Sequence, residues 1–316
     1  MHLLQSLIKR RNTNMYHTTE YNREFWNAAR AKRRIPNATV LETGRDTQNG
    51  SYRLPYESNK KFEAFRQKEN LFRRIGTVVS APKGDYTIWA HDNEPETTWL
   101  TDKDPMFFEN VETYDDYQLD GHTLGCATRV SEDFTEDAGF DVETQVTREF
   151  ARSIGRAEEA ACINGDGVNA PKGFLKDAMI GHYALGIDYS DVVDLFFAQD
   201  PEYRRNSVWI MNNETAYKLR TMTDGDGGYL WNHSDNTLLG KPVYISDYMP
   251  SATEGTGARP IAFGDFSYFW IIDRKPFAMR SLTEVLVPQQ QVGYVGYETI
   301  DAKLIRPEAV CVMQMK

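Results

Sequence analysis

The clearest pattern of apolar and polar positions along the chain runs from Asp141 to Ile163 and predicts a long amphipathic helix. Apolar residues recur there at intervals of three and four, which places them on one face: Val142, Val146, Phe150, Ile154, Ala157 and Ala161. Asp141 is suited to cap the helix start. Asn164, Gly165 and Gly167 are expected to supply the positive φ angles that end it.

Three arginines lie on the polar side of the same predicted helix. Arg148, Arg152 and Arg156 are spaced by four residues, so they form one basic stripe. A solvated helix face is the plain interpretation of this stripe, and contact with another molecule is the alternative.

The chain before this helix starts with an extended entry at Leu54 and continues as a helix that ends near Gly76. Four apolar residues punctuate that helix: Phe62, Phe65, Leu71 and Phe72. A strand is expected over 77–80. Residues 84–116 are polar, and the alternation at Tyr86, Ile88 and Ala90, together with Trp99, predicts two strands of a long hairpin. Such a hairpin has little core of its own, so we expect a neighbouring subunit to bury it.

Short alternating elements follow the long helix. We expect helices over 189–197 and from Asn212 to Arg220, and strands over 118–130, 207–211, 243–246, 261–264, 269–273, 277–282, 292–306 and 309–313. An α/β subdomain is therefore expected near residues 188–274, and the chain then returns to the region of the long helix.

Composition bounds the class of protein. The chain has 316 residues with 41% hydrophobic content and a net charge of −10, and no apolar run approaches the roughly 20 residues that cross a bilayer. Up to Arg34, eight Lys and Arg stand against two Glu, so this start carries +6 and the remaining chain −16. Tyr21, Phe25, Ala28 and Ala29 are suited to a short amphipathic helix, and a linker is expected after it over 33–51. A solvated basic segment over 1–50 is the plain expectation, and contact with nucleic acid or an assembly partner is the alternative. Cys126, Cys162 and Cys311 are expected to be free thiols in a reducing compartment.

The chemistry-bearing residues form no recognisable catalytic constellation. The run from Thr223 to Tyr229 lacks the spacing of a calcium loop or a phosphate loop and predicts a turn. The histidines show no metal-ligand spacing, and the serines lie in no nucleophile elbow. We therefore expect no catalytic residue, no cofactor and no metal site.

Four blocks in order carry a resemblance to a known family. They are S-Y-R-L-P with F-R-Q-K-E-N-L-F-R-R-I-G-T-V-V, then R-A-E-E-A-A-C-I-N-G-D-G-V-N-A-P-K-G-F-L, then V-W-I-M-N-N-E-T-A-Y-K-L-R-T-M-T-D-G-D-G-G-Y-L-W, and L-L-G-K-P-V-Y-I-S-D-Y-M-P. Over residues 50–310 this order resembles the major capsid proteins of tailed bacteriophages of the Hong Kong 97 type.

The resemblance implies an α+β fold with named parts. They are a basic N-terminal segment (1–50), an N-terminal arm (51–83), an extended loop (84–116), a peripheral domain with a long spine helix (117–187 and 275–306), and an α/β axial domain (188–274 and 307–316). Assembly contacts are expected at Phe65, Arg73, Arg74, Trp89, Trp99, Lys103, Arg148, Arg152 and Arg156.

The resemblance also implies partners and a location. The chain is expected to form pentamers and hexamers of an icosahedral shell in the virion, assembled in the cytoplasm of the host bacterium. A scaffolding protein, a portal protein, a maturation protease, packaged double-stranded DNA and a decoration protein are the expected partners, and no membrane is.

Two departures limit the resemblance, and two other functions stay open. Some members cross-link a loop Lys to an Asn near the C-terminus; Lys103 is suited to the first role, but no Asn follows Asn236, so no such cross-link is expected. The first fifty residues are short for a cleaved scaffolding segment, which favours a separate scaffolding protein.

Two alternative functions of the chain stay open: an encapsulin-type nanocompartment shell and a soluble α/β enzyme.

Overall fold

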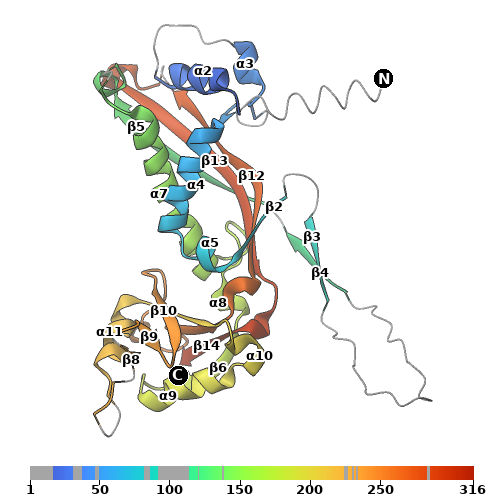
Figure 1. Cartoon of the computed structure of the whole chain (residues 1–316), viewed down its shortest axis with the longest axis vertical. Helices are drawn as coiled ribbons and strands as arrows, with labels where there is room; N and C mark the ends of the chain where they lie inside the picture. The colour runs from blue at the N-terminus through green and yellow to red at the C-terminus, as the bar shows by residue number, and fades with distance from the viewer. Residues whose placement is uncertain are drawn as a thin grey trace, which may run out of the picture.

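The computed structural model places two packed bodies along one long axis (Figure 1). It describes residues 17–30, 38–46, 50–81, 86–91, 114–119, 121–136, 139–223, 227–229, 231–232, 234–282 and 285–316. One body contains the long helix over a sheet, and the other contains the second sheet with its short helices. No helix in these ranges is long and apolar enough to span a membrane.

The sheet of the first body has the order β1-β12-β13-β5, and β2 pairs with β12 beside β1. Its strands are β1 (Tyr52–Arg53), β2 (Thr77–Ser80), β5 (His122–Ser131), β12 (Phe269–Leu282) and β13 (Gln291–Leu304). The two strands expected over 269–273 and 277–282 form one strand, β12. Its register against β13 shifts between Asp273 and Ala278, where the alternation of the sequence is interrupted.

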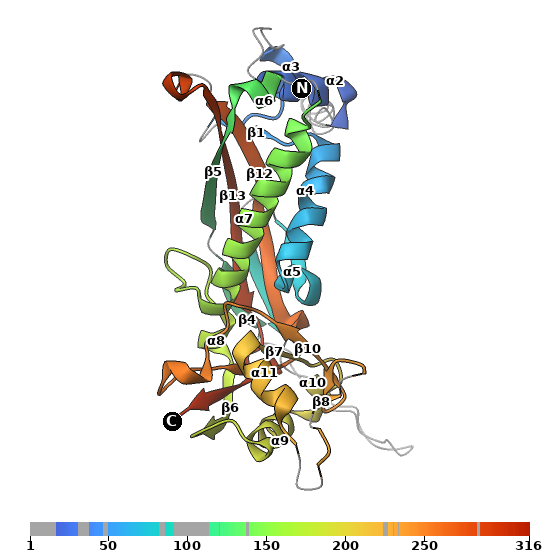
Figure 2. The same ribbon diagram turned by 90° about the vertical axis from the view of Figure 1, so that its left-hand side faces the viewer.

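Helices α4 and α7 lie side by side on one face of this sheet (Figures 1 and 2). The helices of the first body are α2 (Thr19–Ala29), α3 (Ala38–Glu42), α4 (Tyr56–Glu69), α5 (Phe72–Ile75), α6 (Glu132–Glu136) and α7 (Val142–Asn164). Phe277 of β12 stacks on Phe62 of α4 with ring centroids 4.4 Å apart and contacts Phe150 of α7 at 5.4 Å. These rings join both helices to the sheet, because aromatic pairs add directional contact to the burial of apolar area.

The N-terminal part of the described chain belongs to this core. Tyr21, Phe25 and Trp26 of α2 are buried, and Trp26 donates its indole N–H to Ser58 Oγ at 3.0 Å. Tyr294 of β13 donates its hydroxyl to the Ala29 carbonyl at 2.9 Å. The short amphipathic helix expected over 21–29 is confirmed by α2, whereas the linker expected after it is wrong at Ala38–Glu42, where α3 forms. The expected solvated segment is wrong for 17–30 and 38–46, because α2 itself holds one Arg against two Glu and buries its apolar face. Residues 1–16 and 31–37 lie outside the described residues.

The second body is built on a seven-stranded sheet with the order β6-β14-β11-β7-β10-β9-β8. Its strands are β6 (Met179–Ala184), β7 (Val208–Met211), β8 (Trp231–Asn232), β9 (Thr237–Leu238), β10 (Lys241–Ile245), β11 (Ile261–Gly264) and β14 (Val310–Met315). Its helices are α8 (Phe174–Asp177), α9 (Tyr189–Ala198), α10 (Pro201–Arg204) and α11 (Asn213–Thr221). Short 3₁₀ turns occupy Ala252–Glu254, Phe266–Tyr268, Val287–Gln289 and Pro307–Ala309.

Most of these elements follow the sequence expectation. The Asn212 side chain accepts a hydrogen bond from the Thr215 amide at 2.8 Å and starts α11 as predicted. Trp209 of β7 stacks on Phe263 of β11 with centroids 4.2 Å apart, deep in the core of this body. The helices and strands of this body thus pack around one core of their own.

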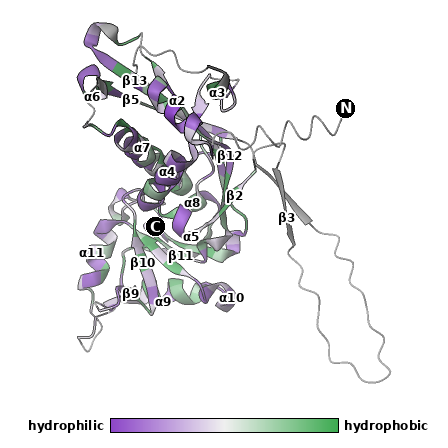
Figure 3. Ribbon diagram, turned by 45° about the horizontal axis from the view of Figure 1, so that its top comes forward, coloured by the Kyte–Doolittle hydropathy of each residue, from purple (hydrophilic) through white to green (hydrophobic). Residues whose placement is uncertain are grey.

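A separate two-stranded hairpin stands beside the two bodies (Figures 1 and 3). It consists of β3 (Tyr86–His91) and β4 (Tyr114–Leu119), paired antiparallel, and among the described strands each pairs only with the other. The first strand of the predicted hairpin is confirmed at Tyr86–His91, and its partner lies at Tyr114–Leu119, at the start of the strand expected over 118–130. Trp99 and Lys103 lie outside the described residues.

The strand pairing differs in two places from the expected domain limits. Strand β6 lies before residue 188, yet it pairs with β14 of the second sheet. Strand β12 starts at Phe269, before residue 275, yet it belongs to the first sheet along its whole length. The limits between the arm, the loop and the two domains remain a prediction.

Candidate functional site

Helix α7 is the element that positions the candidate site, and its ends follow from local chemistry. Asp141 accepts a hydrogen bond from the Thr144 amide at 3.1 Å, and hydrogen bonding to Thr144 lowers the pKa of the Asp141 carboxyl. At the other end, φ is −51° at Gly165 and +77° at Gly167. The predicted positive φ is therefore correct at Gly167 and wrong at Gly165 and at Asn164, which still belongs to α7. A Cβ at Gly165 would lie 1.9 Å from the Pro171 carbonyl oxygen, so close packing is what requires glycine there.

The buried face of α7 changes character halfway along the helix. Val146, Phe150 and Ile154 are buried as predicted. Ala157 is exposed, and Glu158 and Glu159 are buried in its place. The predicted apolar stripe is wrong in this half, because the helix meets arginines rather than apolar side chains here.

Arg66 of α4 is the centre of a buried ion-pair cluster. Its side chain is 1% exposed and lies between the carboxylates of Glu158 on α7 and Glu298 on β13. The Arg66 Nη1 atom donates to Glu158 Oε1 at 3.3 Å and also contacts Glu298 Oε1. Glu63, one turn earlier on α4, accepts from the same guanidinium at the rim of the cluster.

Arg73 of α5 completes this cluster with two-pronged contacts. It donates to both oxygens of Glu158, at 2.7 and 2.8 Å, and to both oxygens of Asp273 on β12, at 3.2 and 2.8 Å. Burial acts to raise the pKa of Asp273, but Arg73 and Arg66 outweigh it and lower the pKa. Planar fork contacts of this kind fix orientation as well as charge, so α5, α7 and β12 are held in one geometry.

With Glu298, the cluster contains one more carboxyl group than it has guanidinium groups. Two guanidinium groups, Arg66 and Arg73, face three carboxyl groups that lie mostly out of water: Glu158, Asp273 and Glu298. Within the described residues, the Glu298 Oε2 atom has no hydrogen-bond partner. Burial raises the pKa of the Glu298 carboxyl to about 8, against the pull of the nearby Arg66. At neutral pH we expect Glu298 to hold a proton, which leaves two cations opposite two buried anions.

The end of α7 also holds the two bodies together. Glu159 accepts from the Leu71 amide at 2.9 Å in the first body and from Ser246 Oγ at 2.5 Å in the second. Asn164 donates its side-chain amide to the Tyr248 carbonyl at 2.7 Å. The same helix is therefore fixed to the first sheet by ion pairs and to the second body by hydrogen bonds.

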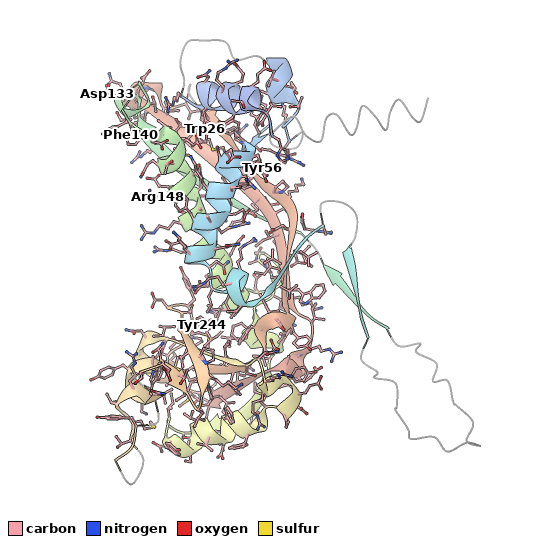
Figure 4. The ribbon with its side chains drawn as sticks, viewed as in Figure 1. Trp26, Tyr56, Asp133, Phe140, Arg148 and Tyr244 are labelled. Carbon is pink, nitrogen blue, oxygen red and sulfur yellow. The ribbon has the colours of Figure 1, made fainter. Side chains whose placement is uncertain are left out.

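The expected assembly residues fall into different environments. Arg148 is exposed, and its guanidinium carbon lies 5.5 Å from the centroid of the half-buried Phe65 ring. Arg156 pairs with Glu69 of α4 at 3.0 Å, and Arg152 is exposed on the same face. Figure 4 shows Arg148 on α7 at the side of the molecule remote from the hairpin.

Two further arginines were expected at contacts. The Arg73 guanidinium is buried inside the subunit and paired with Glu158. Arg73 is therefore a structural residue, and its expected contact role is wrong. Arg74 is exposed, and Trp89 lies on β3.

Sequence reasoning missed Arg66, Glu158, Asp273 and Glu298. The one local signal was the pair Glu158 and Glu159, which follows Ile154 at the spacing of the apolar stripe.

The second body has a surface hollow of about 390 Å³ between the residues that follow β6 and helix α11. Leu185 and Tyr217 line it and are 87% and 71% exposed. Large apolar side chains that remain this exposed in one chain are typical of surfaces that another molecule covers.

Titratable side chains elsewhere show structural arrangements. In the described part of the chain, no group of three or more His, Cys, Asp or Glu is placed to hold a metal ion. His182 of β6 lies 2.9 Å from Asp191, which also closes the capping box of α9. The three cysteines are free, and burial raises the pKa of the Cys162 thiol well above its ordinary value, which disfavours the reactive thiolate.

The sequence of this chain is similar to those of known proteins. The sequence profile of the phage capsid family matches residues 50–315. The major capsid protein of Klebsiella oxytoca phage phiKO2 is 26% identical over 169 residues, which cover 49% of this chain and 40% of that protein. The match therefore spans less than half of that relative's length.

Solved capsid structures share the fold. The capsid of the native GTA particle, computed with C5 symmetry, is 26% identical with a TM-score of 0.61, and that of the empty GTA particle is 28% identical with a TM-score of 0.65. Each match covers 77% of this chain and 89% of that chain. Gordonia phage Cozz, at 12% identity and a TM-score of 0.57 over 78% of this chain and 87% of that chain, shows likeness of fold alone.

These matches confirm the expected α+β fold of the Hong Kong 97 type. The family profile extends over both bodies, from the entry to α4 to the end of β14, and includes every residue of the ion-pair cluster. The chain belongs to the phage capsid family.

Proposed function

We propose that this chain is the major capsid protein of a tailed bacteriophage or a related particle and that it self-assembles into an icosahedral shell around DNA. The family match over 50–315 carries this proposal. The two GTA capsid structures support it, since they share more than a quarter of their aligned residues with this chain and are capsids with five-fold symmetry.

The architecture suits a shell subunit. Two bodies are fixed to each other through α7, whereas the β3–β4 hairpin pairs with neither of the described sheets. A closed shell built from one kind of chain needs heterologous contacts that close by rotation, in pentamers and in hexamers. A rigid centre with a separate hairpin meets that requirement, because the hairpin adapts to the neighbour while the centre keeps its shape.

The expected parts are assigned on this basis. Residues 84–116 are the extended loop, the first body is the peripheral domain with α7 as its spine, and the second body with β6 and β14 is the axial domain. The expected partners are a scaffolding protein, a portal protein, a maturation protease, a decoration protein and packaged double-stranded DNA. The shell is assembled in the host cytoplasm and becomes part of the virion, and the chain acts as a structural protein and not as an enzyme.

Expression of the full chain tests the proposal. Size-exclusion chromatography and negative-stain electron microscopy are expected to show pentamers, hexamers or closed shells. A small oligomer alone, at every protein and salt concentration tried, contradicts the proposal and favours a soluble enzyme. Shells from infected cells that contain an enzyme cargo instead of DNA identify a nanocompartment.

A further inference from the structure

A hollow on one edge of the first sheet is lined mainly by cations. It has a volume of about 200 Å³ and lies where residues 45–46, strand β1 and strand β12 meet. Its charged lining consists of Arg45, Arg53, Arg274, Lys275 and Asp46. Four cations against one carboxylate leave an excess of three positive charges, in a chain whose net charge is −10.

The hollow lies where two short strands share one edge of β12. Strand β2 pairs with β12 up to Asp273, and β1 pairs with it at Ala278 and Met279. Among the described strands, none pairs with residues 274–277 on this edge. The register of β12 against β13 shifts in the same stretch, and Pro276, which has no amide hydrogen to donate, suits such an interruption.

Backbone pairing holds the cations of three segments around this gap. Arg53 lies opposite Ala278 in the pairing of β1 with β12. The Arg53 amide donates to the Gly44 carbonyl at 2.9 Å, and Arg45 forms a bridge with Tyr52. Segments that are far apart in the sequence are therefore fixed around one hollow by the fold itself.

Two described carboxylates near the hollow leave its excess charge in place. Arg45 lies 2.8 Å from Glu42, but the two side chains are 46% and 53% exposed, and such a pair in water contributes little. Even with Glu42 counted, two positive charges remain in excess. Asp273, next to Arg274 in the sequence, accepts from Arg73 at 3.2 and 2.8 Å and so belongs to the buried ion-pair cluster.

A phosphate group with two negative charges matches this lining. A phosphate that is free or bound through one ester carries roughly −1.5 to −2 charges near pH 7, whereas a carboxylate carries one. Arginine forks and lysine ammonium groups are well suited to phosphate oxygens. The hollow is large enough for such an anion, since one water occupies about 30 Å³ in the liquid. Cations that the fold holds close together repel one another, and a bound dianion relieves this repulsion.

We propose that Arg45, Arg53, Arg274 and Lys275 form a binding site for a dianionic phosphate group, either inorganic phosphate or the terminal phosphate of a nucleotide. The site goes beyond the proposed function, because it belongs to a single subunit and needs no neighbour. A phosphate bound there joins residues 45–46, β1 and β12, so it stabilises the folded subunit and raises its melting temperature.

Isothermal titration calorimetry of the full chain with inorganic phosphate, in chloride buffer at constant ionic strength, measures the site. One phosphate is expected to bind per subunit. Arg53→Gln/Lys275→Gln removes two of the four cations and is expected to raise the dissociation constant about tenfold or more. Lys68→Gln/Arg152→Gln, which removes two exposed cations of α4 and α7, is the matched control and is expected to leave it unchanged.

Asp46→Asn tests the same reasoning with the opposite sign. This change removes the one carboxylate of the lining and keeps its shape. Phosphate is therefore expected to bind roughly two- to fivefold more tightly. An unchanged circular dichroism melting temperature in chloride shows that each variant is folded.

Three results overturn the inference: no saturable binding of phosphate by the wild type, equal binding by the folded Arg53→Gln/Lys275→Gln variant, or weaker binding by the folded Asp46→Asn variant. Duplex DNA with hydroxyl ends provides a fourth test. If it binds more tightly than phosphate and loses this binding in Arg53→Gln/Lys275→Gln, the hollow binds backbone phosphates and the dianion assignment is wrong.

Adenosine monophosphate distinguishes the two sources of the phosphate group. Tighter binding than that of inorganic phosphate supports a nucleotide site, and equal or weaker binding supports a site for free phosphate. A wild-type chain that binds phosphate but forms no shell contradicts the proposed function alone and leaves the phosphate site standing.

Discussion

The protonation of Glu298 predicts a stability that depends on pH with a definite sign. Burial raises the pKa of Glu298 from 4.5 to about 8 in the folded subunit. Between these values the unfolded chain loses its proton while the folded chain keeps it, so the unfolded state is favoured as pH rises. Below about pH 4.5 both states hold the proton, and above about pH 8 both have lost it, so this contribution is constant there.

The magnitude follows from the two pKa values. Each pKa unit corresponds to about 1.4 kcal/mol, so the Glu298 contribution to unfolding free energy falls by roughly 2 to 3 kcal/mol from pH 5 to 7 and by roughly 1 kcal/mol more from pH 7 to 9. Glu298→Gln has the shape of the protonated side chain and cannot ionise. Wild type and variant are therefore expected to have similar stability near pH 5, with the variant increasingly more stable up to pH 9.

Urea unfolding of the unassembled subunit at pH 5, 7 and 9 measures this difference. Subtracting the variant from the wild type removes the pH dependence of all other groups. If Glu298 were instead an ionised partner of Arg66, the variant would break a buried ion pair and be less stable by about 3 to 5 kcal/mol at pH 7 and 9. That opposite sign refutes the assignment of the proton.

Three further changes test the site in the unassembled subunit, by the same unfolding measurement. Arg73→Leu leaves the buried Glu158 and Asp273 short of a cation and is expected to cost about 3 to 5 kcal/mol; a loss below 1 kcal/mol contradicts the ion-pair assignment. Gly165→Ala places a methyl group against a carbonyl oxygen and is expected to cost roughly 2 to 4 kcal/mol, whereas Gly186→Ala, with open space around it, serves as its control. Asp141→Ala removes the cap of α7 and is expected to cost about 1 kcal/mol, and no change refutes the cap.

Periodic elements were predictable because their signal is local. The apolar stripe in the first half of α7, the cap at Asp141 and the strand at Ile261–Gly264 are each determined by residues close in sequence. The α2 helix shows where composition misleads. Residues 1–34 are basic as a whole, but the α2 stretch holds one Arg against two Glu. Tyr21, Phe25 and Trp26 form one buried face, so periodicity was the better guide there.

The ion-pair cluster was not predictable from local patterns. Arg66 meets Glu158 across 92 residues and Glu298 across 232, so no window of sequence contains both partners. A charged residue in a helix or strand is expected at the surface until its partner is known, which is why Arg73 was expected at a contact. Strand β12 was expected as two pieces because the alternation of the sequence is interrupted between Asp273 and Ala278, and only the pairing with β13 shows that one strand continues across this register shift.

Electron microscopy of particles formed by the full chain tests the central claim most directly. Closed icosahedral shells with five-fold and six-fold clusters of subunits are the predicted result, and in their reconstruction the hairpin of each subunit is expected to lie over a neighbouring one. A homogeneous preparation that contains only small oligomers, across protein concentrations and with the native DNA and companion proteins supplied, would contradict the account.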